Sequence, residues 1–194
     1  MPLDMLAEVP TETLLTLFAN GDQASAQALT ARLTPIVMGH AFRLLGDRTE
    51  AEDVTQEAMM RLWKIAGEWR QGEAKVTTWL YRVVANLATD RLRRRKRNGP
   101  ALDDIPEVED MSPGPSEFTI ERERQDALQR ALSSLPERQR EAVILRHLEE
   151  MQNPEIAAVM EISTEAVESL VARGKRALKV ALAGKRKELG YGDE

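Results

Sequence analysis

The chain has 194 residues, a formal net charge of −5 and no cysteine. Apolar residues make up 42% and charged residues 30% of the sequence, which is typical of a globular protein with one domain or two small ones. The lack of cysteine excludes disulfides, thiolate catalysis and zinc sites with sulfur ligands, and it fits a reducing cytoplasm. No run of 18 apolar residues occurs and residues 1–9 do not resemble a secretory signal, so we expect a cytoplasmic protein with no membrane span. Nothing in the composition indicates a metal or another cofactor.

Helical periodicity dominates the first half of the sequence, and strand signals are nearly absent. The pattern predicts helices over residues 11–20, 23–45, 49–67 and 77–97. The third of these helices has a start signal, because Thr49 can cap it and Glu52 follows three residues later. Its polar face carries Asp53, Gln56 and Glu57 opposite an apolar stripe, and solubility alone would account for such a face.

Proline and acidic residues interrupt this pattern over residues 98–118, a composition typical of a flexible linker. Beyond it, the periodicity predicts helices over residues 119–134, 136–149, 153–160 and 163–186. We therefore expect an all-α protein in which two small helical domains are joined by a flexible acidic linker. The predicted boundaries are 1–97 for the N-terminal domain, 98–118 for the linker and 119–194 for the C-terminal domain.

The last two predicted helices have the spacing of a helix-turn-helix. The residues placed to form its small core are Ile156, Ala157, Ile162, Val167 and Leu170. Ser163 suits the N-cap of the second helix, whose first residues would then face DNA bases in the major groove. The pattern also fits an ordinary helical hairpin. Glu165 and Glu168 would repel phosphate, although a carboxylate can accept a hydrogen bond from cytosine.

Positive charge is concentrated in two blocks of the sequence. Residues 91–97 carry six positive charges, and residues 173–187 contain seven basic residues and no acidic one. Residues 103–121, between these blocks, contain seven acidic residues and no basic one. A single basic block is often only the solvated end of a helix. Two blocks, each after an apolar-periodic helix, favour a polyanion partner such as nucleic acid.

Four of the eight aromatic residues lie within residues 63–81, directly before the first basic block. Aromatic faces beside cations suit the binding of unstacked bases. Trp63 and Trp79 fit better as core anchors of a helical domain. Trp69 lies in a polar stretch between two predicted helices, so it is the better candidate for an exposed functional residue.

Several segments together resemble conserved regions of bacterial RNA polymerase sigma factors. Residues 51–63 and 78–95 resemble the second region, and residues 135–143 with the helix-turn-helix resemble the fourth. The short chain, with a linker in place of a third domain, resembles the extracytoplasmic-function (ECF) class. This resemblance implies a promoter-specificity factor without enzymatic activity, which binds core RNA polymerase, promoter DNA and an anti-sigma factor.

The resemblance also implies roles for particular residues. Asp53, Gln56 and Glu57 would bind the clamp coiled coil of the largest polymerase subunit. The residues implied to contact the promoter −10 element are Trp69, Gln71, Lys75 and Asn86, with Arg91, Arg93, Arg94 and Arg95 on the duplex just upstream. Those implied to read the −35 element are Ser163, Thr164, Glu165, Glu168, Arg173, Lys175 and Arg176. The −35 preference transfers least, because Glu165 and Glu168 stand where small or basic residues are frequent.

Two other interpretations stay open at this point. A stand-alone helix-turn-helix regulator would require a palindromic site and a stable homodimer, and no coiled-coil heptad supplies the dimer. A nucleic-acid enzyme would need a recognisable catalytic motif. Asp53 and Glu57 supply only two of the ligands that a carboxylate metal site requires.

Overall fold

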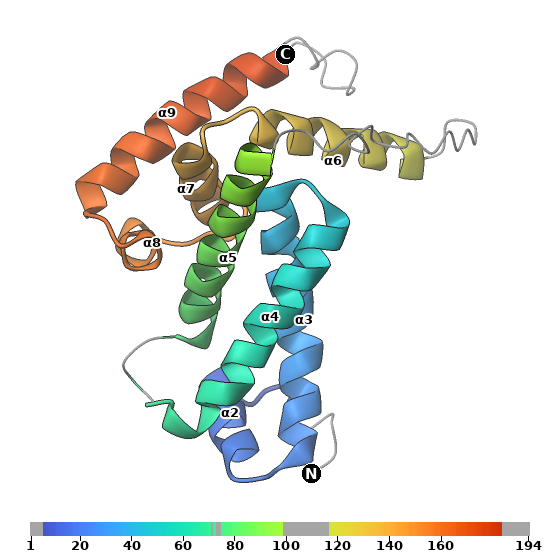
Figure 1. The fold of residues 1–194 in the computed structure, drawn as a ribbon, viewed down its shortest axis with the longest axis vertical. Coiled ribbons are helices and arrows are strands. Elements are labelled where there is room, and N and C mark those ends of the chain that lie inside the picture. The colour runs from blue at the N-terminus through green and yellow to red at the C-terminus, as the bar shows by residue number, and fades with distance from the viewer. Residues whose placement is uncertain (1–5, 71, 73–74, 99–116, 184–194) are drawn as a thin grey trace.

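The computed structural model describes residues 6–70, 72, 75–98 and 117–183 of the chain, and Figure 1 shows their arrangement. Within these residues the regular structure is α-helix with one short 3-10 helix and no strand. The prediction of an all-α fold is confirmed. No helix in this part of the chain is both long and apolar enough to cross a membrane.

The N-terminal half is a helical bundle centred on one long helix. Its helices are α2 (Thr11–Ala19), α3 (Gln23–Leu45), α4 (Arg48–Ile65), the 3-10 turn η1 (Ala66–Glu68) and α5 (Val76–Asn98). Helix α3 packs against α2, α4 and α5. Each of these helices buries an apolar stripe, whose members include Leu29, Leu33, Ala51, Val54, Ala58, Leu62, Leu80 and Val84. The bounds of the four α-helices agree with the predicted ones to within two residues.

The start of α4 differs from the prediction. The N-cap is Asp47, whose carboxylate accepts a hydrogen bond from the Glu50 amide at 2.8 Å, so the predicted Thr49 cap is wrong. Gly46 ends α3 in a left-handed conformation with a φ of 70°. Because the chain reverses there, Asp47 becomes the last residue outside α4 and Thr49 falls inside its first turn.

The C-terminal half consists of α6 (Glu117–Ser133), α7 (Glu137–His147) and the helix-turn-helix of α8 (Asn153–Met160) and α9 (Thr164–Ala183). The predicted core of this motif is confirmed. Ile156 and Val167 are buried in one cluster, and Ala157, Ile162 and Leu170 pack against it.

Local signals account for the turn between α8 and α9. Ser163 Oγ accepts from the Ala166 amide at 3.2 Å, which confirms the predicted N-cap of α9. Glu161 ends α8 with a φ of 54°, a left-handed conformation that glycine adopts most easily. The short turn that starts α9 is therefore made without a glycine.

The two halves of the chain pack against each other, which the sequence did not predict. Helix α5 contacts α3 and α4 in its own half and α8 in the other half (Figure 1). Leu132, Leu135, Val143 and Ile144 of the second half share one buried cluster with the core of the first. The predicted linker over 98–118 lies outside the described residues except at its ends, where α5 ends at Asn98 and α6 begins at Glu117.

Candidate functional site

The acidic face of α4 lines a groove between α4 and α5. Asp53, Gln56 and Glu57 all lie there, opposite the buried stripe of α4, in a groove of about 410 Å³. Met60, with 46% of its surface exposed, adds an apolar side chain to the same groove. The structure thus brings the three residues predicted to bind polymerase together beside an exposed apolar side chain.

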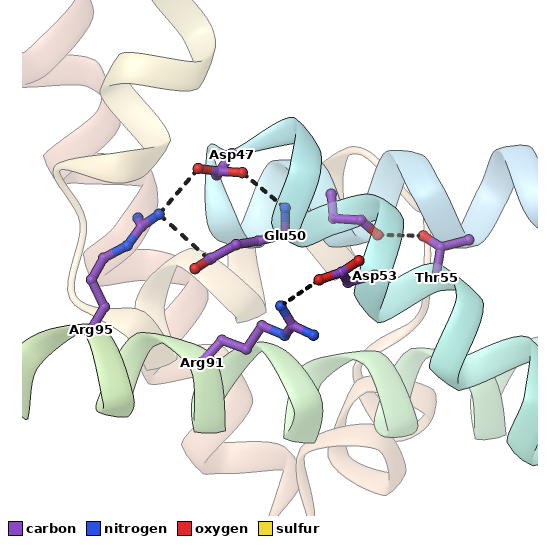
Figure 2. Close-up of polar contacts among 7 residues, drawn as sticks. Asp47, Glu50, Asp53, Thr55, Arg91 and Arg95 are labelled. Carbon is purple, nitrogen blue, oxygen red and sulfur yellow. Dashed lines mark hydrogen bonds and ion pairs between the residues drawn. The ribbon is translucent and has the colours of Figure 1, made fainter. Parts of the chain in front are cut away.

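Two arginines of α5 turn toward this face of α4 (Figure 2). The Arg91 guanidinium donates to Asp53 at 3.1 Å, and Arg95 pairs with Asp47 at 3.2 Å and with Glu50 at 3.5 Å. Side chains four residues apart on a helix lie on the same face, so both arginines of α5 face α4. Such partly exposed ion pairs contribute at most about 1 kcal/mol each, so another anion can displace any of the three carboxylates.

The other predicted DNA-contacting residues of α5 lie on different faces. Arg94 is exposed and lines the groove between α4 and α5. Arg93 and Asn86 are seven residues apart and line a cleft between α5 and the C-terminal half. Because spacings of three, four and seven share a helix face, the predicted −10 residues are divided between two faces of α5.

The cleft beside Asn86 and Arg93 has a volume of about 310 Å³. Three carboxylates of the C-terminal half line its other wall, those of Glu137, Glu141 and Glu161. Burial raises the pKa of Glu141 to about 7. The same wall also carries Arg138 and Arg140, so carboxylates and guanidinium groups both face the predicted DNA-contacting residues.

Trp69 is not exposed, contrary to the prediction. Its ring packs edge-on against Trp79 with ring centroids 6.2 Å apart, and both rings rest on the core of the N-terminal half. Its Nε1 is buried and has no hydrogen-bond partner among the described residues. Trp63 packs against Phe18 at a centroid distance of 4.8 Å. The predicted anchoring role of Trp63 and Trp79 fits these contacts.

Lys75 lies directly before α5. Lys75 Nζ pairs with Glu155 Oε1 of α8 at 2.7 Å, and this hydrogen bond raises the pKa of the lysine. Gln71 lies outside the described residues. A residue predicted to bind DNA is thus paired with a carboxylate from the helix-turn-helix.

The residues predicted for the −35 element follow the outer side of α9. Those exposed to solvent are Ser163, Glu165, Glu168, Arg173, Lys175 and Arg176, and Thr164 is partly exposed. On the opposite side, Gly174 is buried against α7, where a Cβ would lie 2.4 Å from Val143 Cγ2. This close approach of α9 to α7 decides which side of α9 faces outward.

A buried carboxylate, Glu149, joins the two halves, and the sequence analysis missed it. Glu149 follows α7 and accepts from Tyr81 Oη at 2.8 Å and from Arg43 Nη1 at 2.8 Å. His40 Nδ1 lies 3.3 Å from the same carboxylate. Burial alone would raise the pKa of Glu149, but these hydrogen bonds and the Arg43 charge together lower it. Burial lowers the pKa of His40, which favours its neutral form.

No local signal in the sequence marks this cluster. Its four residues come from α3, α5 and the segment after α7, and His40 and Glu149 are 109 positions apart. Within the described part of the chain, no three His, Asp or Glu side chains are grouped as metal ligands.

The chain matches two protein-family models in order along the sequence. Sigma-70 region 2 matches residues 29–98, which span most of α3, α4 and α5. Sigma-70 region 4 matches residues 125–178, which include α7, α8 and most of α9. These two segments carry the acidic face of α4, the basic end of α5 and the outer side of α9.

Two solved structures share the fold. The structure of CnrH in complex with the cytosolic domain of CnrY matches with a TM-score of 0.65 and 23% identity, covering 90% of this chain and 97% of that one. The sigma factor RpoE, in complex with the anti-sigma factor NepR from Bartonella quintana, matches with a TM-score of 0.64 and 23% identity over 81% of this chain and 96% of that one.

Curated relatives agree with the family matches over nearly the whole chain. The RNA polymerase sigma-H factor of Pseudomonas aeruginosa is 28% identical over 187 residues, which cover 92% of this chain and 96% of the relative. The ECF RNA polymerase sigma factor SigE of Mycolicibacterium smegmatis is 33% identical over 182 residues, which cover 91% of this chain and 70% of the relative. The chain therefore belongs to the extracytoplasmic-function class of RNA polymerase sigma factors.

Proposed function

We propose that this chain directs bacterial RNA polymerase to promoters from the cytoplasm, as a factor with no enzymatic activity of its own. The observation that carries the proposal is the ordered match of regions 2 and 4 to one chain. The curated relatives are named RNA polymerase sigma factors, so a stand-alone regulator is not favoured.

In this proposal, the acidic face of α4 docks on core polymerase. Its charged and amide side chains surround the exposed Met60, and a mixture of apolar and polar groups is usual at protein interfaces. Asp53 is also the partner of Arg91. Docking on Asp53 would therefore free Arg91 for DNA.

The −10 element is assigned to the region around α5. Arg93 and Arg94 are exposed, and the ion pairs of Arg91 and Arg95 are weak enough for phosphate to replace them. Trp69 remains a predicted contact of an extruded base, for which its Nε1 donor, buried without a partner in the described residues, would have to become accessible. Asn86, Lys75 and Gln71 remain predicted contacts of the same element.

The −35 element is assigned to the outer side of α9. Its basic residues, Arg173, Lys175 and Arg176, suit phosphate contacts, whereas its first turn would face the bases. Glu165 and Glu168 then select for donors such as cytosine N4. We also expect an anti-sigma partner, since RpoE, one of the structural relatives, is bound to an anti-sigma factor.

The test is binding to core RNA polymerase and transcription in a reconstituted reaction. Purified chain should bind bacterial core polymerase, and the Gln56→Ala/Glu57→Ala double variant should bind at least tenfold more weakly. Both side chains are on the solvent side of α4, so the variant should keep the wild-type helical content and thermal midpoint.

A matched double variant with the same side-chain changes controls for the loss of charge. Gln27→Ala/Glu123→Ala changes exposed residues of α3 and α6 and should bind polymerase as wild type does. Unchanged binding by the α4 variant would move the docking surface elsewhere. No binding by folded wild-type chain would refute the proposed function.

A further inference from the structure

Helix α5 begins without a capping side chain of its own. Lys75 occupies the N-cap position, because its carbonyl oxygen accepts the first helical hydrogen bond, from the Trp79 amide at 3.1 Å. A lysine side chain only donates hydrogen bonds, so it cannot accept from the free amides of the first turn. The start of α5 therefore needs an acceptor from elsewhere in the molecule.

Glu12 of α2 supplies that acceptor. Its Oε1 accepts a hydrogen bond from the Val76 amide at 3.1 Å, across 64 positions of sequence. Val76 is the first residue of α5 and is fully buried. A carboxylate suits this place because it interacts favourably with both the free amides and the positive end of the helix dipole. The pKa of Lys75 is raised mainly by Glu155, and the charge of Glu12 adds to this shift, so Glu12 also acts on the residue before α5.

Helix α2 also supports the segment that leads from α4 to α5. The 3-10 turn η1 packs against α2 (Figure 1), and Ala66 of η1 is buried. The Trp69 amide donates to the Ala66 carbonyl oxygen at 3.4 Å, so the position of Trp69 depends on that of η1. Near the other end of α2, Phe18 packs against Trp63 of α4. Contacts with α2 therefore fix both Trp69 and the start of α5.

One arginine of α3 anchors the start of α2. The Arg32 guanidinium donates to three carbonyl oxygens and one hydroxyl at 2.7 to 3.2 Å, those of Leu6, Ala7, Val9 and Thr11. Leu6 is itself fully buried in the core of the N-terminal half. The first turn of α2, which carries the capping carboxylate, is therefore held at a defined position relative to α3.

This helix lies outside the part of the chain that matches sigma-70 region 2. The match covers residues 29–98 and begins within α3, whereas α2 ends at Ala19. Trp69 and Lys75, which the proposed function assigns to the −10 element, lie inside the match. A helix beyond the matched region thus holds residues of the candidate −10 surface.

We propose that Glu12 is a positioning residue for −10 recognition: by capping α5 from α2, it fixes the start of α5 and the place of Lys75. The inference rests on the proposed function, because it takes this end of α5 as part of the −10 surface. Base selectivity requires contacting groups to be placed to within about 0.5 Å. The polymerase-docking face of α4 does not include this end of α5. Loss of the cap should therefore reduce selectivity for −10 bases and leave polymerase affinity unchanged.

Three variants test whether the capping contact exists as described. Glu12→Ala removes the acceptor, Glu12→Gln keeps an oxygen that can accept from the Val76 amide, and Glu8→Ala changes an exposed glutamate nearby. Hydrogen exchange of the Val76 amide should be about fivefold faster in Glu12→Ala, the effect of one lost hydrogen bond. It should be less affected in Glu12→Gln and unchanged in Glu8→Ala.

Base selectivity is measured with each variant bound to core RNA polymerase. The templates are promoters that the wild-type protein transcribes, randomised over either the −10 or the −35 element, and transcript sequencing gives the ratio between the best and the worst base at each position. Glu12→Ala should lower this ratio about fivefold at one or more −10 positions. Glu12→Gln should lose less, and Glu8→Ala should lose nothing. The ratios at −35, which the proposed function assigns to α9, should not change in any variant.

A stability control shows whether a weaker fold alone could alter selectivity. Leu29→Val shortens a fully buried side chain of α3 and should lower the thermal midpoint without removing the cap of α5. This variant can reduce the amount of transcript, but its base preferences should be those of the wild type.

The outcomes separate this inference from the proposed function. Unchanged −10 preferences in Glu12→Ala would overturn the inference, because the contact would then only stabilise the fold. Equal losses at −10 and −35, equal losses in Glu12→Ala and Glu12→Gln, or unchanged exchange of the Val76 amide would overturn it as well. Failure of the wild-type chain to transcribe with core polymerase would instead refute the proposed function, whatever the exchange of Val76 shows.

Discussion

At the scale of single residues, two buried carboxylates show how surroundings decide charge. Glu149 receives hydrogen bonds from three side chains of the other half, and its pKa is lowered. Glu141 is buried on α7, where desolvation raises its pKa to about 7 and the Arg138 charge offsets only part of the effect. The two groups therefore give opposite contributions to the pH dependence of stability.

Glu141→Gln should remove a loss of stability that occurs as the pH rises. The folded chain holds a proton on Glu141 up to about pH 7, whereas the unfolded chain releases it near pH 4, so the free energy of unfolding falls between these values. Above pH 7 the variant should be more stable than wild type by roughly 1–3 kcal/mol, with no gain at pH 4. Chemical denaturation at pH 4, 6 and 8 measures this difference.

The exposed Glu123 of α6 supplies the control for this prediction. Glu123→Gln should leave the slope of stability with pH unchanged. Glu149→Gln should act in the opposite sense, since a lowered pKa stabilises the fold above the unfolded value and this is lost as the pH falls. If the free energy of unfolding changed equally with pH in wild type and in Glu141→Gln, Glu141 would be ionised in the folded protein and the prediction would be contradicted.

At the scale of elements, Asp47 contributes to stability both as the N-cap of α4 and as an ion-pair partner of Arg95, and substitutions can separate the two contributions. Asp47 accepts from the Glu50 amide and pairs with Arg95. Asp47→Ala should cost about 1–2 kcal/mol of unfolding free energy. Asp47→Asn keeps a capping oxygen and should cost less than about 1 kcal/mol. Thermal denaturation of both variants and of Thr49→Ala checks the assignment, and a larger loss for Thr49→Ala would contradict it.

The contact of α9 with α7 depends on the missing side chain at Gly174. A Cβ there would lie 2.4 Å from Val143 Cγ2 and 3.1 Å from the Gln139 carbonyl oxygen. Valine is stiff and the carbonyl is fixed, so Gly174→Ala should destabilise the protein by about 1–2 kcal/mol despite the better helix propensity of alanine. Gly67→Ala, where the Cβ meets open space, should be neutral or stabilising. A neutral Gly174→Ala would mean that α9 can move away from α7.

The helices themselves could be predicted from the sequence because their signals are local. Apolar spacing located every α-helix between Thr11 and Ala183 that the structure describes, and Ser163 marked the start of α9. The predictions were wrong at residues whose local structure or exposure depends on a neighbouring element. The chain reversal at Gly46 moved the cap from Thr49 to Asp47, and Trp79 shelters Trp69 inside a polar stretch.

At the scale of the whole molecule, the sequence indicated polymerase and DNA as partners, but it did not indicate how the two halves of the chain pack together. The basic and acidic residues of the candidate site were visible, since charge and the family resemblance mark them. Their division between two faces of α5, and the pairing of Lys75 with Glu155, depend on how the halves dock. Such docking brings together residues that are as many as 109 positions apart, for which one sequence carries no periodic signal.

A shared core predicts that the two halves unfold together. Leu132 of α6 is buried in the same cluster as Leu29 of α3, so Leu132→Ala should cost about 2–5 kcal/mol. In a cooperative molecule this loss should lower the hydrogen-exchange protection of the slowest amides of α3 as much as that of α7. Leu29→Ala should act reciprocally on α7. If each variant weakened protection only in its own half, the halves would be independent domains, and the contact between them would be of low stability rather than part of the folded core.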